Sequence, residues 1–442
     1  MNIKINSKEV KAGDTFVAIR GVRNDGHKYI KDAIKNGAKR IIAEEGKYDV
    51  ETIIVDDTKK YLEEYLYNNY YDKISKLKLI GMTGTNGKTT TCFLIYQALN
   101  KKNIKCAYIG TIGFYTDEIV STNNTTPNLY ELYNMLLTCV DKGYEYVVME
   151  VSSQGLSYGR VNTLLFDYVI FSNLTMDHLD YHKTMDNYLH EKLKLFNKTR
   201  NGYAIINNDD EYSKYFLLDN KNITYGKSNS DYIISDINVN MNGSSFKLND
   251  TLYHTKLIGE YNVYNMCNVI ILLELLGIKD IELIDELESP EGRMDIVNFN
   301  DNLIIIDFAH TPDALKKIIE TVSNIKHNKI ITVIGCGGNR DIEKRRLIGE
   351  IATKNSDYVL FTSDNPRMED PNEILDDITC SLDRKNFEII VNRKECINKS
   401  IQMLSKNDIL LLLGKGHENY QIIGKEKIPF NDKNTVLDIL GR

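Results

Sequence analysis

Residues 81–91 read Gly-Met-Thr-Gly-Thr-Asn-Gly-Lys-Thr-Thr-Thr, between an apolar, strand-like run at 77–80 and a helix-like segment from Thr89 to Leu99. Glycines allow a tight turn that points backbone N–H groups at a phosphate, and the N-terminus of the following helix adds positive potential. In such a loop Lys88 reaches the outer phosphates and the hydroxyl of Thr89 binds Mg²⁺. The stretch therefore predicts nucleotide binding. Met82 replaces the first glycine of the usual pattern, so a chance match in a turn rich in Gly and Thr is the alternative.

The composition limits the classes of protein to consider. A chain of 442 residues, with 42% hydrophobic and 26% charged residues, is expected to form two or three globular domains. A net charge of −7 argues against a general nucleic-acid or membrane-surface binder. Seven scattered cysteines without a C-x-x-C motif indicate reduced thiols in a cytoplasmic protein, not disulfides or a zinc site. We find no apolar stretch long enough to insert into a membrane.

From about residue 75, short apolar runs alternate with longer helical patterns, which is typical of a parallel α/β sheet. Most of the predicted strands lead directly into loops rich in glycine and polar residues, and ligands of open parallel sheets bind at the carboxyl ends of the strands. The strands are expected at 77–82, 145–151, 166–172, 203–207, 303–307, 329–334, 357–363, 387–391 and 409–413. Residues 1–74 form a smaller unit with a helix at 29–36, and a second boundary is expected near 289–297.

Two acidic segments are candidates for a metal site. Glu150 ends a buried-looking strand and could bind Mg²⁺ opposite the phosphate loop, although a helix-capping or solvated glutamate is the alternative. Residues 177–182, Asp-His-Leu-Asp-Tyr-His, contain four possible ligands. Their spacing and the absence of a nearby cysteine argue against zinc, and the oxygen-rich surroundings favour Mg²⁺ with one imidazole. An ordinary polar loop explains the segment equally well.

Two arginines lie in loops at the ends of two predicted strands. Arg340 lies in Gly337-Gly338-Asn339-Arg340-Asp341, and Arg367 ends Asp364-Asn365-Pro366-Arg367. An arginine binds a carboxylate through two parallel hydrogen bonds. Together with Glu418, the pair predicts a ligand that carries both carboxylate and ammonium groups. Internal Arg–Asp pairing within these loops is the alternative.

The motifs, taken in order along nearly the whole chain, resemble those of the Mur ligases. Within that family they are most similar to the type that adds the third amino acid to the peptidoglycan precursor UDP-N-acetylmuramoyl-L-alanyl-D-glutamate. The motifs that carry the resemblance lie at 13–18, 83–89, 124–127, 149–153, 177–182, 259–265, 292–294, 309–314, 364–367 and 414–418.

The resemblance implies three α/β domains: an N-terminal UDP-binding domain at 1–74, a central parallel-sheet ATPase domain at 75–294 and a C-terminal Rossmann-like domain at 295–442. It implies an ATP-dependent ligase that joins meso-diaminopimelate to the γ-carboxylate of the D-glutamyl residue through an acyl phosphate, as a cytoplasmic monomer. L-Lysine as the amino acid and a related ligase of specialised metabolism are alternatives. A phosphate-loop ATPase without ligation is a third, which leaves the two arginines and Glu418 unexplained.

The resemblance also assigns residues. The catalytic residues are expected to be Lys88, Glu150, His178 and Lys192, with Lys192 converted by CO₂ into a carbamate. The Mg²⁺ ligands are expected to be Thr89, Glu150, His178 and carbamylated Lys192. The ATP site is expected at Gly84, Thr85, Asn86, Gly87, Lys88, Thr89, Thr90, Asn265 and Arg293. The UDP-sugar dipeptide site is expected at Ser7, Asn124, Thr125, Thr126, Ser152, Tyr158 and Arg160. The diaminopimelate site is expected at Arg340, Asp364, Asn365, Pro366, Arg367, Gly414 and Glu418.

The chain departs from the family pattern at a few positions. Lys8 stands in place of a usual arginine, Gln154 of a histidine, Tyr158 of a glutamine and Phe308 of a tyrosine, and the chain begins without the short leader that usually precedes the Ser7 motif. None of these changes falls on the phosphate loop, the expected metal ligands or the two arginines.

Overall fold

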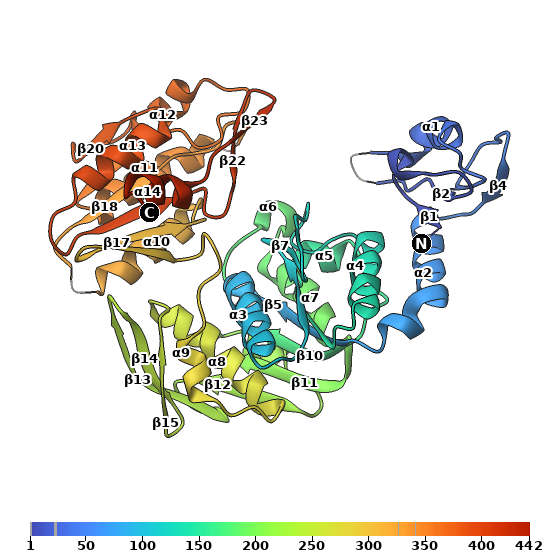
Figure 1. The fold of residues 1–442 in the computed structure, drawn as a ribbon, viewed down its shortest axis with the longest axis horizontal. Coiled ribbons are helices and arrows are strands. Elements are labelled where there is room, and N and C mark those ends of the chain that lie inside the picture. The colour runs from blue at the N-terminus through green and yellow to red at the C-terminus, as the bar shows by residue number, and fades with distance from the viewer. Residues whose placement is uncertain (1, 22–23, 326, 341) are drawn as a thin grey trace. The chain divides into compact units, whose positions relative to one another are not determined.

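The computed structural model describes residues 2–21, 24–325, 327–340 and 342–442. It divides into two compact units, Met1–Lys88 with Leu99–Ile223, and Thr89–Ala98 with Thr224–Arg442. Each of the predicted strands is present within four residues of its expected bounds. The α/β prediction is confirmed, because parallel sheets covered by helices build the fold (Figure 1).

The N-terminal region forms a small parallel sheet of four strands, β1 Ile3–Lys4, β2 Thr15–Val17, β3 Arg40–Ala43 and β4 Glu51–Ile54. The helix predicted at 29–36 is α1, Ile30–Lys35, and its buried Ile30 and Ala33 pack with Phe16 and Ile41 of the sheet. A short 3-10 turn, Ser7–Glu9, follows β1. The helix α2, Thr58–Ile74, ends this region.

The phosphate-loop strand β5, Lys78–Thr83, lies in the middle of a parallel sheet, between β9 Tyr146–Glu150 and β10 Phe166–Phe171. Gly81 allows this packing, because a Cβ there would lie 2.7 Å from the Phe166 ring. The sheet continues through β11 Thr199–Asn207 on one side and β6 Cys106–Gly110, β7 Gly113–Tyr115 and β8 Ile119–Val120 on the other. The helices of this part are α3 Lys88–Lys101, α4 Leu129–Asp141, α5 Ser153–Ser157, α6 Leu179–His182 and α7 Met185–Phe196.

The second unit opens with a segment that the sequence patterns did not predict. Strand β12, Asn222–Gly226, pairs with β13, Tyr232–Asn240, and an antiparallel meander follows through β14 Gly243–Leu248 and β15 Thr251–Thr255. Two helices come next, α8 Glu260–Leu275 and α9 Ile281–Asp285.

The C-terminal sheet has the order β16-β17-β21-β18-β19-β20, and only β16 is antiparallel to its neighbour. Its central strand reads Ile-Leu-Leu-Leu-Leu at 409–413 because alternate residues enter two cores, one on each face of the sheet. The strands are β16 Asp295–Phe299, β17 Asn302–Asp307, β18 Ile330–Ile334, β19 Tyr358–Phe361, β20 Phe387–Ile389 and β21 Ile409–Leu413.

Five helices cover this sheet, shown in orange and red in Figure 1. Helices α10 Pro312–Ser323, α11 Ile342–Asn355 and α12 Pro371–Thr379 share one core, and α13 Arg393–Gln402 and α14 Asp432–Ile439 share the other. A hairpin of β22 Tyr420–Ile423 and β23 Glu426–Pro429 follows the central strand.

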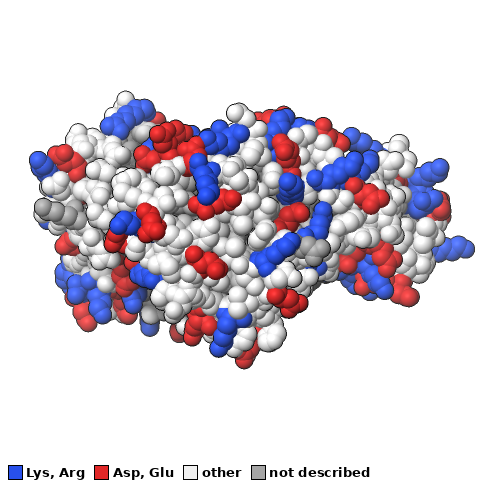
Figure 2. Space-filling view, turned by 90° about the horizontal axis from the view of Figure 1, so that it is seen from below, with Lys and Arg blue, Asp and Glu red and all other residues white. Residues whose placement is uncertain are grey.

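The structure gives the state of the cysteines, the character of the helices and the distribution of charge on one face. All seven cysteines are free thiols, and only Cys380 is exposed. Among the described residues no helix is long and apolar enough to cross a membrane. On the face that Figure 2 presents, basic and acidic side chains are interspersed and not separated by sign.

Candidate functional site

The phosphate loop joins the end of β5 to the start of α3, as predicted. Gly84 has no room for a side chain, because a Cβ would lie 1.9 Å from Ser172 Oγ, and Gly87 has a left-handed φ of 87°. Lys88 Nζ donates to the carbonyls of Gly84 at 2.7 Å and Thr85 at 3.0 Å. These contacts hold the ammonium beside the loop backbone. Thr89 and Thr90 are buried in the first turn of α3.

The loop after β10 supports the phosphate loop from one side. Thr85 N and Asn86 N donate to the backbone carbonyl and the side-chain Oδ1 of Asn173, both at 2.9 Å. Ser172 Oγ in turn donates to Asn86 O at 2.7 Å. The sequence pointed to this loop as a site element but did not identify Ser172 and Asn173 as its contacts.

Lys192 lies on α7 with 1% of its surface exposed. Its Nζ donates to Gly84 O at 2.7 Å and lies 4.5 Å from the centre of the Tyr188 ring. Burial lowers the pKa of Lys192 well below its usual range, the positive charge of Lys88 lowers it further, and Asp177 acts weakly in the opposite direction. At neutral pH this environment favours the uncharged amine.

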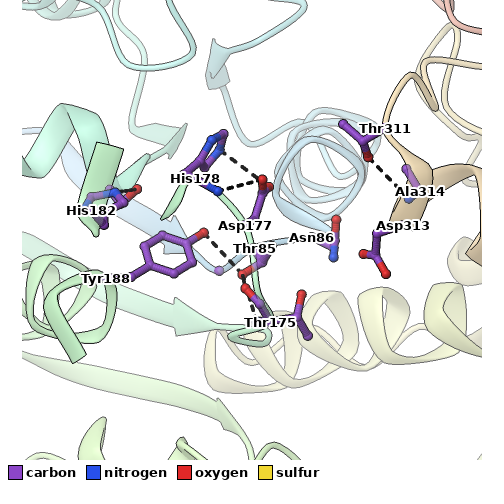
Figure 3. Close-up of polar contacts among 12 residues, drawn as sticks. Thr85, Asn86, Thr175, Asp177, His178, His182, Tyr188, Thr311, Asp313 and Ala314 are labelled. Atoms are coloured by element: carbon purple, nitrogen blue, oxygen red, sulfur yellow. Dashed lines mark hydrogen bonds and ion pairs between the residues drawn. The ribbon is translucent and has the colours of Figure 1, made fainter. Parts of the chain in front are cut away.

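His178 lies near the same aromatic ring. Its φ of 53° is left-handed, its Nε2 lies 3.6 Å from Asp177 Oδ2, and its ring centre is 6.3 Å from that of Tyr188. The Tyr188 and Thr85 hydroxyls share a hydrogen bond at 3.2 Å (Figure 3). Tyr188 thus connects His178, Lys192 and the phosphate loop, a role that sequence alone did not reveal. The nearby His182 is buried and contacts Ser153 Oγ at 2.9 Å.

Glu150 ends β9, next to the phosphate-loop strand, and is fully buried. Its Oε1 accepts from Tyr108 Oη at 2.5 Å and from Thr111 N at 2.8 Å, and Thr111 Oγ1 donates to Oε2 at 3.2 Å. The alternative of a solvated glutamate is therefore wrong. Within the described residues no three His, Cys, Asp or Glu side chains form a metal-binding group. A metal held by Glu150 and His178 would thus need further ligands, such as hydroxyls or a modified lysine.

The residues expected to bind the sugar and peptide converge beside Glu150. Thr126 Oγ1 donates to Glu150 O at 2.9 Å and lies 3.1 Å from Ser152 Oγ. Arg160 Nη1 donates to Thr126 O at 2.7 Å, and its guanidinium lies 5.4 Å from the centre of the Tyr158 ring. Thr125 Oγ1 lies 3.0 Å from Thr111 Oγ1, and Asn124 is exposed.

Ser7 lies in a different part of the chain, on the wall of a cavity of about 660 Å³ in the N-terminal sheet region. Phe16, Tyr29 and Asn36 line the same cavity, and Asn36 Nδ2 donates to Ser7 O at 2.9 Å. A cavity with an aromatic wall and polar groups is of the kind that a nucleoside could occupy.

Asn265 and Arg293 lie in the second unit. Asn265 is buried on α8, where Thr91 Oγ1 donates to its Oδ1 at 3.2 Å and its Nδ2 donates to Asn262 Oδ1 at 2.9 Å. The guanidinium of Arg293 lies 5.1 Å from the centre of the Phe308 ring, and its buried Nε has no hydrogen-bond partner within the described part of the chain. In the same unit Thr311 Oγ1 accepts from Ala314 N at the start of α10 (Figure 3).

The loops that follow β18, β19 and β21 converge, because these strands are neighbours in the sheet. Arg367 has a left-handed φ of 54°, and its Nη1 donates to Gly338 O at 2.7 Å. A Cβ at Gly337 would lie 3.0 Å from Arg367 Nη1 and 3.8 Å from Arg340 Cγ, so the two arginines flank this glycine. Arg340 itself is exposed.

Acidic and amide groups lie in the same pocket. Asn365 Nδ2 donates to Glu418 Oε2 at 2.8 Å, and a Cβ at Gly414 would lie 2.8 Å from Asp364 Oδ2. Burial raises the pKa of Asp364, while the charges of Arg393 and Lys415 oppose that shift. Pro366 is buried between Asn365 and Arg367. The structure thus brings together the seven residues expected to bind the amino acid.

Arg345, which the sequence patterns did not single out, supports both arginine loops. This side chain is 2% exposed and forms ion pairs with Glu369 and Asp377, both at 2.8 Å. Glu369 also accepts from the backbone N–H of Asn339, next to Arg340. Arg340 and Arg367 have no ion-paired carboxylate among the described residues, so internal pairing is not seen there. Asp341 lies outside those residues.

Three family models match the chain. They are the Mur ligase family catalytic domain at 1–74, the Mur ligase middle domain at 82–273, and the glutamate ligase domain of Mur ligases at 292–416. These matches cover most of the chain.

Curated relatives and a solved structure extend the match to the full length. The chain is 42% identical over 460 residues to the UDP-N-acetylmuramoyl-L-alanyl-D-glutamate--2,6-diaminopimelate ligase of Clostridium perfringens, covering 99% of this chain and 94% of that protein. The enzyme of the same name from Aquifex aeolicus is 40% identical, with 99% and 93% covered. A solved structure of an enzyme with this name has a TM-score of 0.71 at 31% identity, with 99% and 94% covered.

A more distant structure shares the fold alone. The MurF ligase of Thermotoga maritima, in complex with ADP, has a TM-score of 0.69 at 21% identity and covers 99% of this chain and 96% of its own. Domain matches, full-length relatives and solved structures agree, and the chain belongs to the Mur ligase family, with its fold of three α/β domains.

Proposed function

We propose that this chain is the ATP-dependent ligase that joins meso-2,6-diaminopimelate to the D-glutamyl γ-carboxylate of UDP-N-acetylmuramoyl-L-alanyl-D-glutamate, in peptidoglycan precursor synthesis in the cytoplasm. The observation that carries the proposal is the pocket at the carboxyl ends of β18, β19 and β21. It combines Arg340, Arg367 and Glu418 in a chain that is 42% identical to a diaminopimelate ligase of this kind. A zwitterionic ligand with an additional carboxylate fits these charges.

An amide forms from a carboxylate only after its oxygen has become part of a better leaving group. In the first step the γ-carboxylate attacks the γ-phosphorus of ATP, and ADP leaves. The neutral amine of diaminopimelate then attacks the acyl carbon of the acyl phosphate, phosphate leaves, and the nitrogen loses its proton. Two anions meet in the first step, so positive charge and positioning provide most of the catalysis. Lys88 and the N–H groups of the phosphate loop supply that charge in our proposal.

The residues present fit a Mg²⁺ ion. Glu150 offers a carboxylate already oriented by Tyr108 and Thr111, and Thr89 and His178 offer a hydroxyl and an imidazole. The ion would neutralise phosphate charge when bound. The residues also fit a carbamate on Lys192, because its pKa is lowered and its Nζ lies beside the phosphate loop. We propose that this modification converts a buried neutral amine into an anionic metal ligand.

The proposed substrate is tested with an amino-acid panel. Purified enzyme is supplied with ATP, Mg²⁺ and the UDP-sugar dipeptide, and ADP release is measured with meso-diaminopimelate, L-lysine or no amino acid. We expect release only when all substrates are present, and a preference for meso-diaminopimelate of roughly 10⁴ or more, because a lysine would leave Arg367 without a carboxylate. Equal use of L-lysine would contradict this assignment of Arg367.

A pair of arginine variants separates substrate recognition from general damage. Arg367→Ala should reduce use of meso-diaminopimelate steeply and leave the KM for ATP unchanged. Arg346→Ala changes an exposed arginine on α11 and is the matched control, which should behave as the wild type.

A further inference from the structure

Lys415 is a buried lysine that the proposed reaction does not yet use. It follows the central strand β21, and none of its surface is exposed. Gly414 and Gly416 on either side have left-handed φ values of 105° and 51°. A Cβ at Gly416 would lie 2.7 Å from Phe308 Cβ, so this turn tolerates no larger residue. The tight turn therefore directs Lys415 into the domain and not into solvent.

The ammonium of Lys415 contacts two residues of the amino-acid pocket. Nζ lies 2.9 Å from Glu418 Oε2 and 3.3 Å from Asn365 Oδ1. Asn365 Nδ2 donates to the same Glu418 oxygen at 2.8 Å, and Asn365 Oδ1 also accepts from Ile422 N at 2.8 Å. Both ends of the Asn365 amide are thus used, and Glu418 Oε2 receives two hydrogen bonds. Glu418 Oε1 has no hydrogen-bond partner among the described residues.

The buried charges behind this pocket are unequal in number. Arg393 and Asp432 are fully buried and form a bidentate pair, with Nε–Oδ1 at 2.8 Å and Nη2–Oδ2 at 2.6 Å. Lys415 and Glu418 form a second pair. Asp364 is buried beside both pairs and has no ion-pair partner of its own among the residues described. These five side chains thus comprise three carboxylates and two cations, which favours a positive ligand group beside Glu418, whereas Arg340 and Arg367 of the same pocket are left for the carboxylates of the ligand.

Building on the proposed function, we propose that Lys415 is a positioning residue that fixes Glu418 and Asn365 so that Glu418 Oε1 receives the ammonium group of the incoming amino acid. An ammonium that donates to a carboxylate has no lone pair for attack, so this group is the one that does not react. Arg367 recognises the additional carboxylate, and Lys415 acts, through Glu418, on the ammonium that diaminopimelate and lysine share. The two residues thus control different parts of the same ligand.

The experiment compares Lys415→Met, which keeps the length of the side chain, with Lys399→Met. Lys399 pairs with Glu388 on the surface of the same domain and is 45% exposed, so it is the matched control. We expect Lys415→Met to raise the KM for meso-diaminopimelate about thirtyfold or more. The KM values for ATP and for the UDP-sugar dipeptide should change less than twofold, and so should the preference for meso-diaminopimelate over L-lysine. A purely structural role would raise all three KM values together, and that result would overturn the proposal.

A double-mutant cycle tests whether Lys415 acts through Glu418. The variants are Lys415→Met, Glu418→Gln and both together. The double variant removes both charges of the pair and so leaves no unpaired buried charge. If Lys415→Met alone does not fold, the KM of the double variant can still be compared with that of Glu418→Gln. We expect the double variant to have the KM of Glu418→Gln within twofold. Additive effects would show that Lys415 acts independently of Glu418 and would refute the proposal.

The wild-type measurement separates this inference from the proposed function. If the wild type releases ADP with a different amino acid and not with meso-diaminopimelate, the proposed substrate is wrong. The KM values of the same variants are then measured with that other amino acid as the substrate. If the wild type uses meso-diaminopimelate but Lys415→Met keeps its normal KM, the proposed function stands and the role of Lys415 is wrong.

Discussion

Lys192 and Lys415 are two lysines of equal burial with opposite surroundings. Lys192 is 1% exposed, donates to the Gly84 carbonyl, and has no carboxylate partner among the described residues. Lys415 is 0% exposed and lies 2.9 Å from Glu418 Oε2. Burial and the charge of Lys88 lower the pKa of Lys192, whereas Lys415 has an anion to offset its charge.

The difference shows that burial alone does not determine what a lysine can do. A desolvated lysine without an anion favours the neutral amine, which is a nucleophile and can react with CO₂. A desolvated lysine beside a carboxylate can remain a fixed cation, which orients its partner. In our two proposals the same side chain therefore serves chemistry at Lys192 and positioning at Lys415.

The largest expected effect concerns the modification of Lys192. Lys192→Ala should lose about 10³-fold or more in kcat, because it removes an anionic group from a site where phosphate charge is stabilised. Acetate or formate should restore part of the rate by supplying a carboxylate, whereas the same salts should leave Lys415→Ala unchanged. Turnover is measured as ADP release. A near-normal rate for Lys192→Ala would contradict a chemical role for Lys192 and so remove the proposed difference between the two lysines.

The next effect concerns the lysine that lies beside Lys192. Lys88→Ala should reduce kcat by at least about a hundredfold, because a contact to the transferred phosphate is typically worth ~3–4 kcal/mol. The circular dichroism spectrum should be unchanged, since Lys88 Nζ donates to the Gly84 and Thr85 carbonyls of the loop and the substitution leaves the strands of the sheet intact. A variant that turns over normally would rule out the assigned role of the phosphate loop.

A smaller effect is expected from pH. The pKa of Lys192 lies below its usual value, so the amine is neutral above that lowered pKa and takes up a proton as the pH falls through it. Enzyme depleted of CO₂ should therefore regain activity with bicarbonate at pH 8, and this reactivation should decline by up to about tenfold per unit below the lowered pKa. Reactivation of the Lys415→Met variant by bicarbonate should have the same pH dependence as that of the wild type. Activity that is independent of bicarbonate at every pH would argue against a carbamate.

The smallest effect is on stability, and its sign should differ between the two lysines. Because the pKa of Lys192 is lowered on folding, the unfolded chain binds more protons between the two pKa values, and stability rises with pH across that window. In CO₂-free buffer at pH 7, Lys192→Met removes this cost and should raise stability by about 1 kcal/mol, or roughly 2–4 °C in Tm.

The matched change at the other lysine should have the opposite sign. Lys415→Met leaves Glu418 without its cation and should lower stability by about 1–3 kcal/mol. Glu418 is 20% exposed, so the loss should be smaller than for a fully buried pair. The Tm of both variants is measured by thermal denaturation in the same buffer. Tm shifts of equal sign would show that the burial of the lysine affects stability more than its pairing with a carboxylate does.

The sequence alone predicted much of the fold and the places where ligands would bind. The nine predicted strands are present because each contains a short run rich in apolar residues, as expected of a sheet that is covered on both faces. The arginine loops and the Glu418 loop converge as predicted, since parallel strands place their carboxyl ends at one edge. Strands such as β7, β8 and β13–β15 were missed because they are short or lie in antiparallel hairpins, which lack such runs.

Only the tertiary structure determined which charges are paired. Arg393 pairs with Asp432, and Arg345 with Glu369, across 39 and 24 residues of sequence. Lys192 lies in Glu191-Lys192-Leu193 and Lys415 in Gly414-Lys415-Gly416, and neither tripeptide shows whether its lysine is buried. Their surroundings differ because the fold brings Lys88 and the Gly84 carbonyl to Lys192, and the polar side chains of Asn365 and Glu418 to Lys415. The strength of an electrostatic interaction depends on the distance between the charges in the folded protein, and a local sequence pattern does not give that distance.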